Sequence, residues 1–98
     1  MDHTQLLMMK TNDKVCVNSK YVCTIVDANP FNSFEKDSNS GSYFSSAKII
    51  VENYDDNAEL NVVLHPTLSY KFSSNICFLN DDGYAKSLTT ITDVKMLK

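Results

Sequence analysis

Apolar and polar residues alternate along much of the chain, in short segments that polar turn residues separate. Alternation with a period of two indicates a strand with one buried and one solvated face. The clearest case is 58–64, where Leu60, Val62 and Leu64 fall on one face. The pattern predicts an all-β chain with five strands, at 14–26, 43–53, 58–64, 75–79 and 84–97.

Two of these segments contain an irregularity. Asn18-Ser19-Lys20 interrupts 14–26, which suits either a bulge in one long bent strand or a tight hairpin turn. A long bent first strand is what the closing of a small barrel requires. In 43–53 the alternation slips near Ser45-Ser46, and such a slip is typical of a bulge.

The connections differ in length and composition. Residues 27–42 are rich in Pro, Gly, Asn, Asp and Ser, and a loop of this length in a compact domain is usually functional or disordered. The loop also contains Phe31 and Phe34, which either fold back on the core or wait for a partner. Residues 54–57 form a short turn, and 80–83 end in the glycine that a tight hairpin needs.

This order of segments predicts a small antiparallel β-barrel, OB-like, with five strands and at most one short helix. A closed barrel would leave so short a chain without exposed sheet edges. An open β-sandwich or a β-roll with one helix is the alternative, and an SH3-like barrel is a third. We expect residues 14–98 to form this single domain. Residues 1–13 are expected to form an N-terminal arm, whose apolar cluster at 6–9 suits a short helix or a contact with a neighbour.

The length and composition fit one soluble domain. With 98 residues, 43% of them hydrophobic, the chain can bury one small core. No apolar segment approaches the roughly 20 residues of a membrane helix, and no secretory signal frames the cluster at 6–9, so we expect a cytoplasmic protein. Because a small barrel has little core, pairing of two copies would add buried area, and we expect a homodimer.

The cysteines and acidic turns predict no metal site. Cys16, Cys23 and Cys77 lie in apolar segments, and their odd number and loose spacing indicate buried free thiols rather than disulfides or a zinc site. Asp55-Asp56 and Asp81-Asp82 resemble parts of calcium loops but lack the alternating ligands and the terminal Glu. We interpret them as solvated turn carboxylates.

The histidines do not predict catalysis. His3 and His65 are the only two, and His65 precedes a proline at a predicted strand end, where a turn role is common. No Ser, His and acid fall into a recognisable arrangement, and the partners that general acid–base chemistry needs are not apparent. We expect neither an enzyme nor a bound cofactor.

The charge limits the nucleic acids that this chain could bind. The formal net charge is −3, and all nine cationic residues are lysines. Bidentate recognition of guanine and of phosphate favours arginine, so the composition disfavours a sequence-specific reader of duplex DNA. An acidic total does not exclude nucleic acid, because binding depends on the local field.

Single-stranded nucleic acid, DNA or RNA, is the sharper hypothesis. Small barrels bind it by stacking bases on aromatic rings beside cations, with little sequence preference. Of the adjacent pair Tyr43 and Phe44, one side chain points outward in a regular strand, and we expect it to be Tyr43, with Phe44, Phe72 and Phe78 mostly buried. The candidate binding residues are Phe31, Phe34, Lys36, Tyr43, Lys48, Tyr54, Tyr84 and Lys86.

The layout of the chain resembles the small single-stranded-DNA-binding proteins of filamentous phages and related mobile elements. The similar part runs from about 14 to 98 and contains an early loop with aromatics, then GSYFSSAKIIVEN, then NDDGYAKSLTTITDVKMLK. The resemblance implies a five-stranded barrel, a protruding early loop that contacts DNA, and a symmetric dimer. It also implies base stacking by Phe31, Phe34 and Tyr43, with Lys36 and Lys48 at phosphates.

A protein-interaction module is the competing hypothesis. A small acidic domain of phage or plasmid type could bind and block a host protein. The turns Asp55-Asp56 and Asp81-Asp82 would then imitate a row of phosphates, and Phe31 and Phe34 would anchor in a pocket of the partner. A structural or virion subunit, assembled through the N-terminal arm, is a third interpretation.

Overall fold

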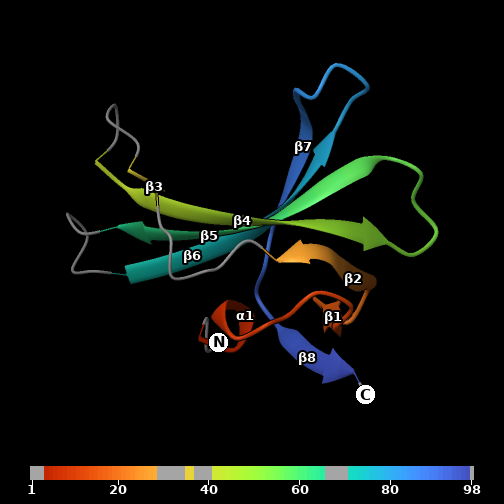
Figure 1. Ribbon diagram of the computed structural model, residues 1–98, viewed down its shortest axis with the longest axis horizontal. Helices are drawn as coiled ribbons and strands as arrows, with labels where there is room; N and C mark the ends of the chain where they lie inside the picture. Colours follow the sequence, from red (N-terminus) through yellow and green to blue (C-terminus); the bar gives the residue numbers. More distant parts are fainter. Residues whose placement is uncertain (1–3, 29–34, 37–40, 66–70, 98) are drawn as a thin grey trace.

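The computed structural model describes residues 4–28, 35–36, 41–65 and 71–97, which form one short helix and eight β-strands (Figure 1). The all-β prediction is confirmed, although the strands are more numerous than the five expected. In chain order the elements are α1 (Thr4–Leu7), β1 (Lys14–Val17), β2 (Tyr21–Ala28), β3 (Glu35–Lys36), β4 (Tyr43–Val51), β5 (Asn57–His65), β6 (Lys71–Leu79), β7 (Ala85–Thr90) and β8 (Val94–Leu97).

All the described strands belong to one antiparallel sheet with the order β7-β6-β5-β4-β2-β1-β8, and β3 pairs with β4 beside this order. The long strands β4, β5 and β6 form its centre (Figure 1). β4 pairs with β5 without a register shift from Tyr43 to Ile49, so the bulge expected near Ser45-Ser46 is wrong. A shift lies instead in β2, between Ile25 and Asp27.

The first predicted segment is a hairpin, β1–β2, rather than one bent strand. Asn18 and Ser19 both have a φ of 55°, and the Lys20 N–H donates to the carbonyl of Val17 at 3.1 Å. Two consecutive residues of positive φ match the right-handed twist of the flanking strands, and asparagine tolerates this conformation better than most residues.

The last predicted segment is divided between two ends of the sheet. β7 pairs with β6, and β8 pairs with β1, although only residues 91–93 separate β7 from β8. Because so short a link spans at most about 14 Å, the sheet curls on itself (Figure 1). No pairing between β7 and β8 occurs in the described part of the chain, so the described sheet is open, and closure into an OB-like barrel stays a prediction.

Asn18 fastens the link between these two strands. Its Nδ2 donates to the carbonyl of Thr90 at 2.9 Å, and its Oδ1 accepts the backbone N–H groups of Thr92 at 2.7 Å and Asp93 at 3.1 Å. The Asn18 N–H donates in turn to the carbonyl of Asp93 at 2.8 Å. The β1–β2 turn therefore holds the link between β7, which pairs with β6, and β8, which pairs with β1.

The concave face of the sheet carries the hydrophobic core. Leu6 and Met9, from and just after α1, are both buried, so this part of the expected N-terminal arm packs in the same core as the strands. Burial of one such leucine side chain stabilises the fold by about 1.5–3 kcal/mol. The core residues are Leu6, Met9, Val15, Val17, Cys23, Ile25, Ala47, Ile49, Val51, Ala58, Leu60, Val62, Ile76, Phe78 and Ile91.

Candidate functional site

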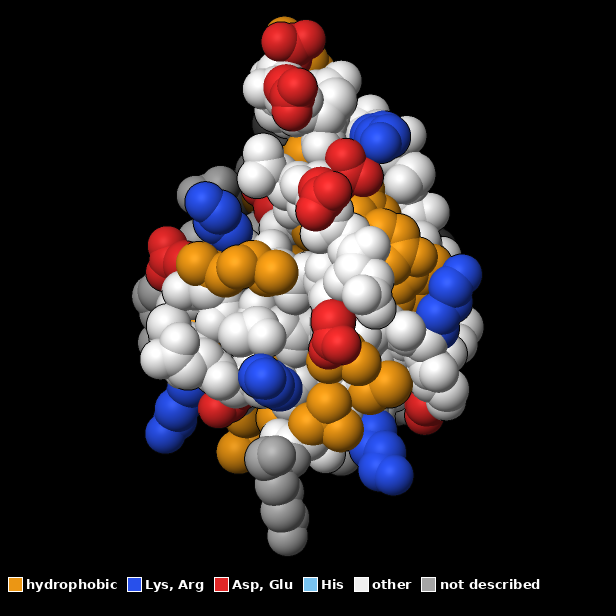
Figure 2. All heavy atoms as spheres, turned by 90° about the vertical axis from the view of Figure 1, so that its right-hand side faces the viewer, with side chains coloured by type: hydrophobic (Ala, Val, Ile, Leu, Met, Phe, Trp, Pro, Cys, Tyr) orange, Lys and Arg blue, Asp and Glu red, His pale blue; other side chains and the backbone are white. Residues whose placement is uncertain are grey.

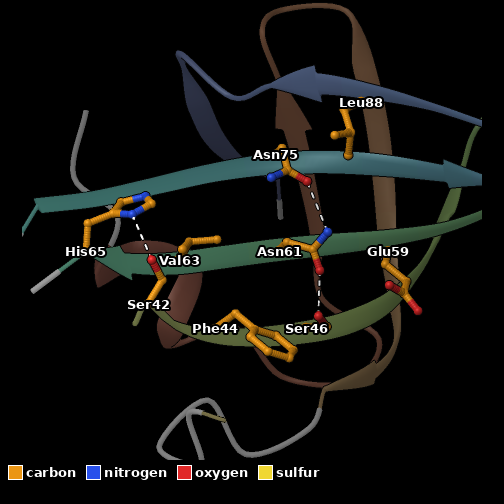
Figure 3. Close-up of a pocket in the computed structure, with 9 residues that line it drawn as sticks. All are labelled: Ser42, Phe44, Ser46, Glu59, Asn61, Val63, His65, Asn75 and Leu88. Carbon is orange, nitrogen blue, oxygen red and sulfur yellow. Dashed lines mark hydrogen bonds between the residues drawn. The ribbon is translucent and has the colours of Figure 1, made fainter. Parts of the chain in front are cut away.

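The opposite, outer face of β4, β5, β6 and β7 is hollowed into an open groove of about 440 Å³ (Figure 3). We call it the outer groove. Alternate residues of β4, β5 and β6 point into it, while those between them point towards the core. Its lining residues are Ser42, Phe44, Ser46, Glu59, Asn61, Val63, His65, Asn75 and Leu88.

A ladder of neutral polar side chains crosses the floor of the outer groove. Ser46, Asn61 and Asn75 lie directly opposite one another on β4, β5 and β6. The Ser46 hydroxyl donates to Asn61 Oδ1, and Asn61 Nδ2 donates to Asn75 Oδ1 at 3.0 Å (Figure 3). Side chains opposite each other in antiparallel strands are close enough for such bonds, which here fix the orientation of both amides.

His65 closes one end of the outer groove and is held on both sides. Its Nδ1 lies 3.2 Å from the Ser42 hydroxyl, and its Nε2 lies 2.9 Å from the Ser73 hydroxyl. No carboxylate among the described residues hydrogen-bonds to the ring, and both nitrogens are engaged. This geometry orients the imidazole but is unlike the Ser-His-acid arrangement of a hydrolase.

Two exposed apolar side chains flank the polar floor. Phe44, on β4, is 36% exposed, and Leu88, on β7, is 65% exposed. Val63 lies beside Phe44 on β5, directly opposite it in the register. The outer groove therefore combines apolar contact area at its sides with hydrogen-bonding groups on its floor, which is the composition of many binding surfaces.

The orientation expected for Tyr43 and Phe44 is wrong. Phe44 points into the outer groove, whereas Tyr43 is half-buried on the other face, in the row that contains Leu64 and Phe72. Of the three phenylalanines expected to be mostly buried, Phe78 is buried and Phe72 is half-buried, packed against the core. The exposed ring on β4 is therefore Phe44.

The other candidate rings are dispersed. Phe31 and Phe34 lie outside the described residues. Tyr54 stacks on Phe78, with ring centroids 5.2 Å apart, and contacts Tyr21 at 5.7 Å, so part of its surface is already covered. Tyr84 is 73% exposed at the β6–β7 turn and lies outside the outer groove.

The candidate lysines have acidic neighbours. Lys48 lies directly opposite Asp27 on β2 and Glu59 on β5. Lys86 Nζ forms an ion pair with Asp56 at 3.1 Å. The ion pair offsets the charge of Lys86, and acidic residues on both sides of Lys48 lower the local positive potential that a polyanion would meet.

The distribution of charge agrees with this assessment. Lys36 is exposed and pairs with Tyr43 in the register. The side chain of Tyr43 lies on the face of the sheet opposite to the outer groove. Figure 2, which views the molecule from the right-hand side of Figure 1, shows lysine side chains set apart from one another and several carboxylates towards one end. The described lysines on the face that Figure 2 shows form no continuous cationic track.

The cysteines are free thiols. Cys23 and Cys77 are buried, and Cys16 is half-buried. Burial raises the pKa of the Cys23 thiol from 9.0 to about 12, with a smaller contribution from Cys16, and burial together with Glu59 raises the pKa of Cys77. The two buried thiols are therefore protonated at neutral pH and poor nucleophiles.

Sequence reasoning did not find the outer groove. In the sequence, its floor corresponds to polar residues at every second position, in Glu59-x-Asn61 and in Ser73-x-Asn75. That signal marks a solvated face but does not say which residues of different strands lie opposite each other.

The described residues contain no group of three or more His, Cys, Asp or Glu side chains that could hold a metal ion. None of the helices formed by these residues has both the length and the apolar composition needed to cross a membrane.

Searches of protein-family models, of curated proteins and of solved structures find no match to this chain. The outer groove is therefore interpreted from its own geometry.

Proposed function

We propose that this chain is a protein-binding module, without a catalytic role, that holds a segment of a partner protein in the outer groove. The observation that carries the proposal is the pairing of two exposed apolar side chains, Phe44 and Leu88, with a neutral hydrogen-bonding floor. An aromatic side chain beside a groove is a typical anchor of protein interfaces. Asn61 and Asn75 offer amide groups that complement a peptide backbone. The acidic composition favours a protein partner over a polyanion.

Electrostatics supports a protein partner over a polyanion. The net charge is −3, and Lys48 and Lys86 face carboxylates. Binding a polyanion requires lysines that are free to neutralise its phosphates and to displace the counterions bound to them. Apolar contacts and neutral hydrogen bonds require no such cations, and they are little affected by salt.

Substitution of the groove anchor tests the proposal. The tagged wild-type protein, Phe44→Ala and Met8→Ala are used in parallel to capture a partner from source cells, and affinity for the purified partner is then measured. Met8 is a matched control, since it is an apolar side chain that is 77% exposed outside the groove. We expect Phe44→Ala to weaken binding about tenfold or more and Met8→Ala to leave it unchanged. Equal affinity of all three proteins would contradict the proposal.

Single-stranded nucleic acid remains a second candidate, because the rings of Phe44 and Tyr84 are exposed and every base has a face that stacks on such rings. A labelled oligo-dT titrated at low ionic strength tests it. Because the net charge is −3 and both Lys48 and Lys86 face carboxylates, the wild-type protein is expected to show no saturable binding. Saturable binding that weakens steeply with salt and is lost in Phe44→Ala would establish this second function instead.

A further inference from the structure

The two ends of the outer groove differ in charge. Glu59 is the only carboxylate among the described residues that line the groove, and Figure 3 shows it at the end opposite to His65. At the other end, Lys71 is exposed and lies directly opposite His65 in the register. A ligand that lies along the groove therefore meets a negative charge at one end and none at the other.

The Glu59 carboxylate is not neutralised within the chain. No ion pair joins it to a lysine in the described part of the molecule. Lys48, directly opposite it on β4, also lies opposite Asp27 on β2. One ammonium group cannot balance two carboxylates, so these three side chains together carry a net negative charge. The field of Glu59 also reaches Cys77, its neighbour on β6, where it adds to the effect of burial in raising the pKa of the thiol.

The groove runs along β5. This strand supplies four lining residues at alternate positions, Glu59, Asn61, Val63 and His65. Alternate residues of a strand are about 6.6 Å apart, so the row from Glu59 to His65 is about 20 Å long. An extended peptide has the same repeat. The side chains on one of its faces therefore match the spacing of this row.

We propose that the segment held in the outer groove is an extended peptide with a lysine or arginine four positions before or after an apolar residue. The apolar side chain contacts Phe44 and Val63, which lie directly opposite each other. The basic side chain places its charge at Glu59, about 13 Å further along β5. The residue midway between them lies over the amide of Asn61. This inference rests on the proposed function of the groove and names the chemistry of its partner.

The surface beside Glu59 suits a long basic side chain. Glu59, Cys77 and Leu88 are aligned across β5, β6 and β7. Cys77 is buried between the other two, whereas Leu88 is 65% exposed. Lysine and arginine pack their aliphatic stems on apolar surface while the charged head stays outside it, here within reach of the carboxylate. An acidic side chain is disfavoured at this end, because its charge would repel that of Glu59.

Selection of random decapeptides on the immobilised protein tests the proposal. We expect the peptides that are enriched on the wild-type protein relative to Phe44→Ala to carry a lysine or arginine four positions from an apolar residue. Enriched peptides without such a basic residue would overturn this proposal and leave the groove proposal standing. If no peptide prefers the wild-type protein to Phe44→Ala, the groove proposal fails as well.

Removal of a single charge locates the contact. Glu59→Gln keeps the shape of the side chain, and Glu52→Gln is a matched control, since Glu52 is exposed outside the groove. We expect an enriched basic peptide to bind Glu59→Gln about fivefold more weakly than the wild-type protein, and Glu52→Gln with unchanged affinity. The same peptide with glutamine at its basic position should bind the wild-type protein and Glu59→Gln equally. Equal affinities of the two variants for the basic peptide would contradict a contact at Glu59.

Discussion

At the scale of single residues, one position decides what the outer face offers to a partner. Phe44 points out and Tyr43 points in, so the exposed ring on β4 is purely apolar and lies beside the amide floor of Asn61 and Asn75. A tyrosine there would add a hydroxyl and suit a wetter contact. The residue-level chemistry of the outer groove is thus apolar contact beside neutral hydrogen bonding, with one carboxylate, that of Glu59, in its lining.

The buried thiols make a pH-dependent contribution to stability. Burial raises the pKa of Cys23 to about 12, so the folded thiol stays protonated at a pH where the unfolded thiol is ionised. The resulting stability is fully present below the unfolded pKa and is lost as pH rises from there through the folded pKa. The loss over this alkaline range is up to about 4 kcal/mol, at about 1.4 kcal/mol for each unit of pKa shift.

Chemical unfolding at a series of alkaline pH values measures this effect. The free energy of unfolding of the wild-type protein should fall more steeply with pH above about 9 than that of Cys23→Ala. The comparison uses slopes because the alanine variant is also destabilised by the cavity it creates, at every pH. Equal slopes in the two proteins would show that Cys23 does not titrate differently on folding.

Side-chain alternation allowed much of the residue-level pattern to be predicted. Leu60 and Val62 are buried as expected, because one clean alternation runs through β5. The orientation of Phe44 could not be inferred, since Tyr43 and Phe44 are both aromatic and the next two residues are both serines. Only the pairing of β4 with β5 assigns each of them to a face.

At the scale of elements, a turn residue that is distant in sequence from β7 and β8 controls how these two strands are placed. Asn18 makes side-chain hydrogen bonds to Thr90, Thr92 and Asp93, more than 70 positions along the chain. The sequence reveals the interruption at 18–20 but not the partners of Asn18. The division of the last segment into β7 and β8 depends on those partners and was therefore missed.

Substitution of Asn18 should loosen the junction of β7 and β8. Asn18→Ala removes the side-chain hydrogen bonds and places alanine at a φ of 55°, so we expect a loss of about 2–3 kcal/mol in the free energy of unfolding. Asn18→Gly removes the same bonds but tolerates the backbone conformation, and its loss should be smaller. Denaturant unfolding checks both. A surface position without such contacts typically changes the free energy of unfolding by less than about 0.5 kcal/mol. A loss that small in Asn18→Ala would contradict this role.

At the scale of the whole molecule, the two faces of the sheet have separate roles. The inner face, with Leu6 and Met9 beside the strands, forms the core. The outer face carries the groove at its centre and the exposed strand β7 at one edge. The all-β class was predictable because it follows from alternation within segments. The surface was not, since it arises from register between strands that the sequence does not state.

Photo-crosslinking from the outer groove tests the central claim most directly. A benzoylphenylalanine replaces Phe44 in one protein and, as a control, the exposed Met8 in another, and each is irradiated in source cells. The account predicts a discrete adduct from position 44 alone, removed by protease and resistant to nuclease. An adduct that nuclease removes, or the same adducts from both positions, would contradict the assignment of the outer groove as a protein-binding site.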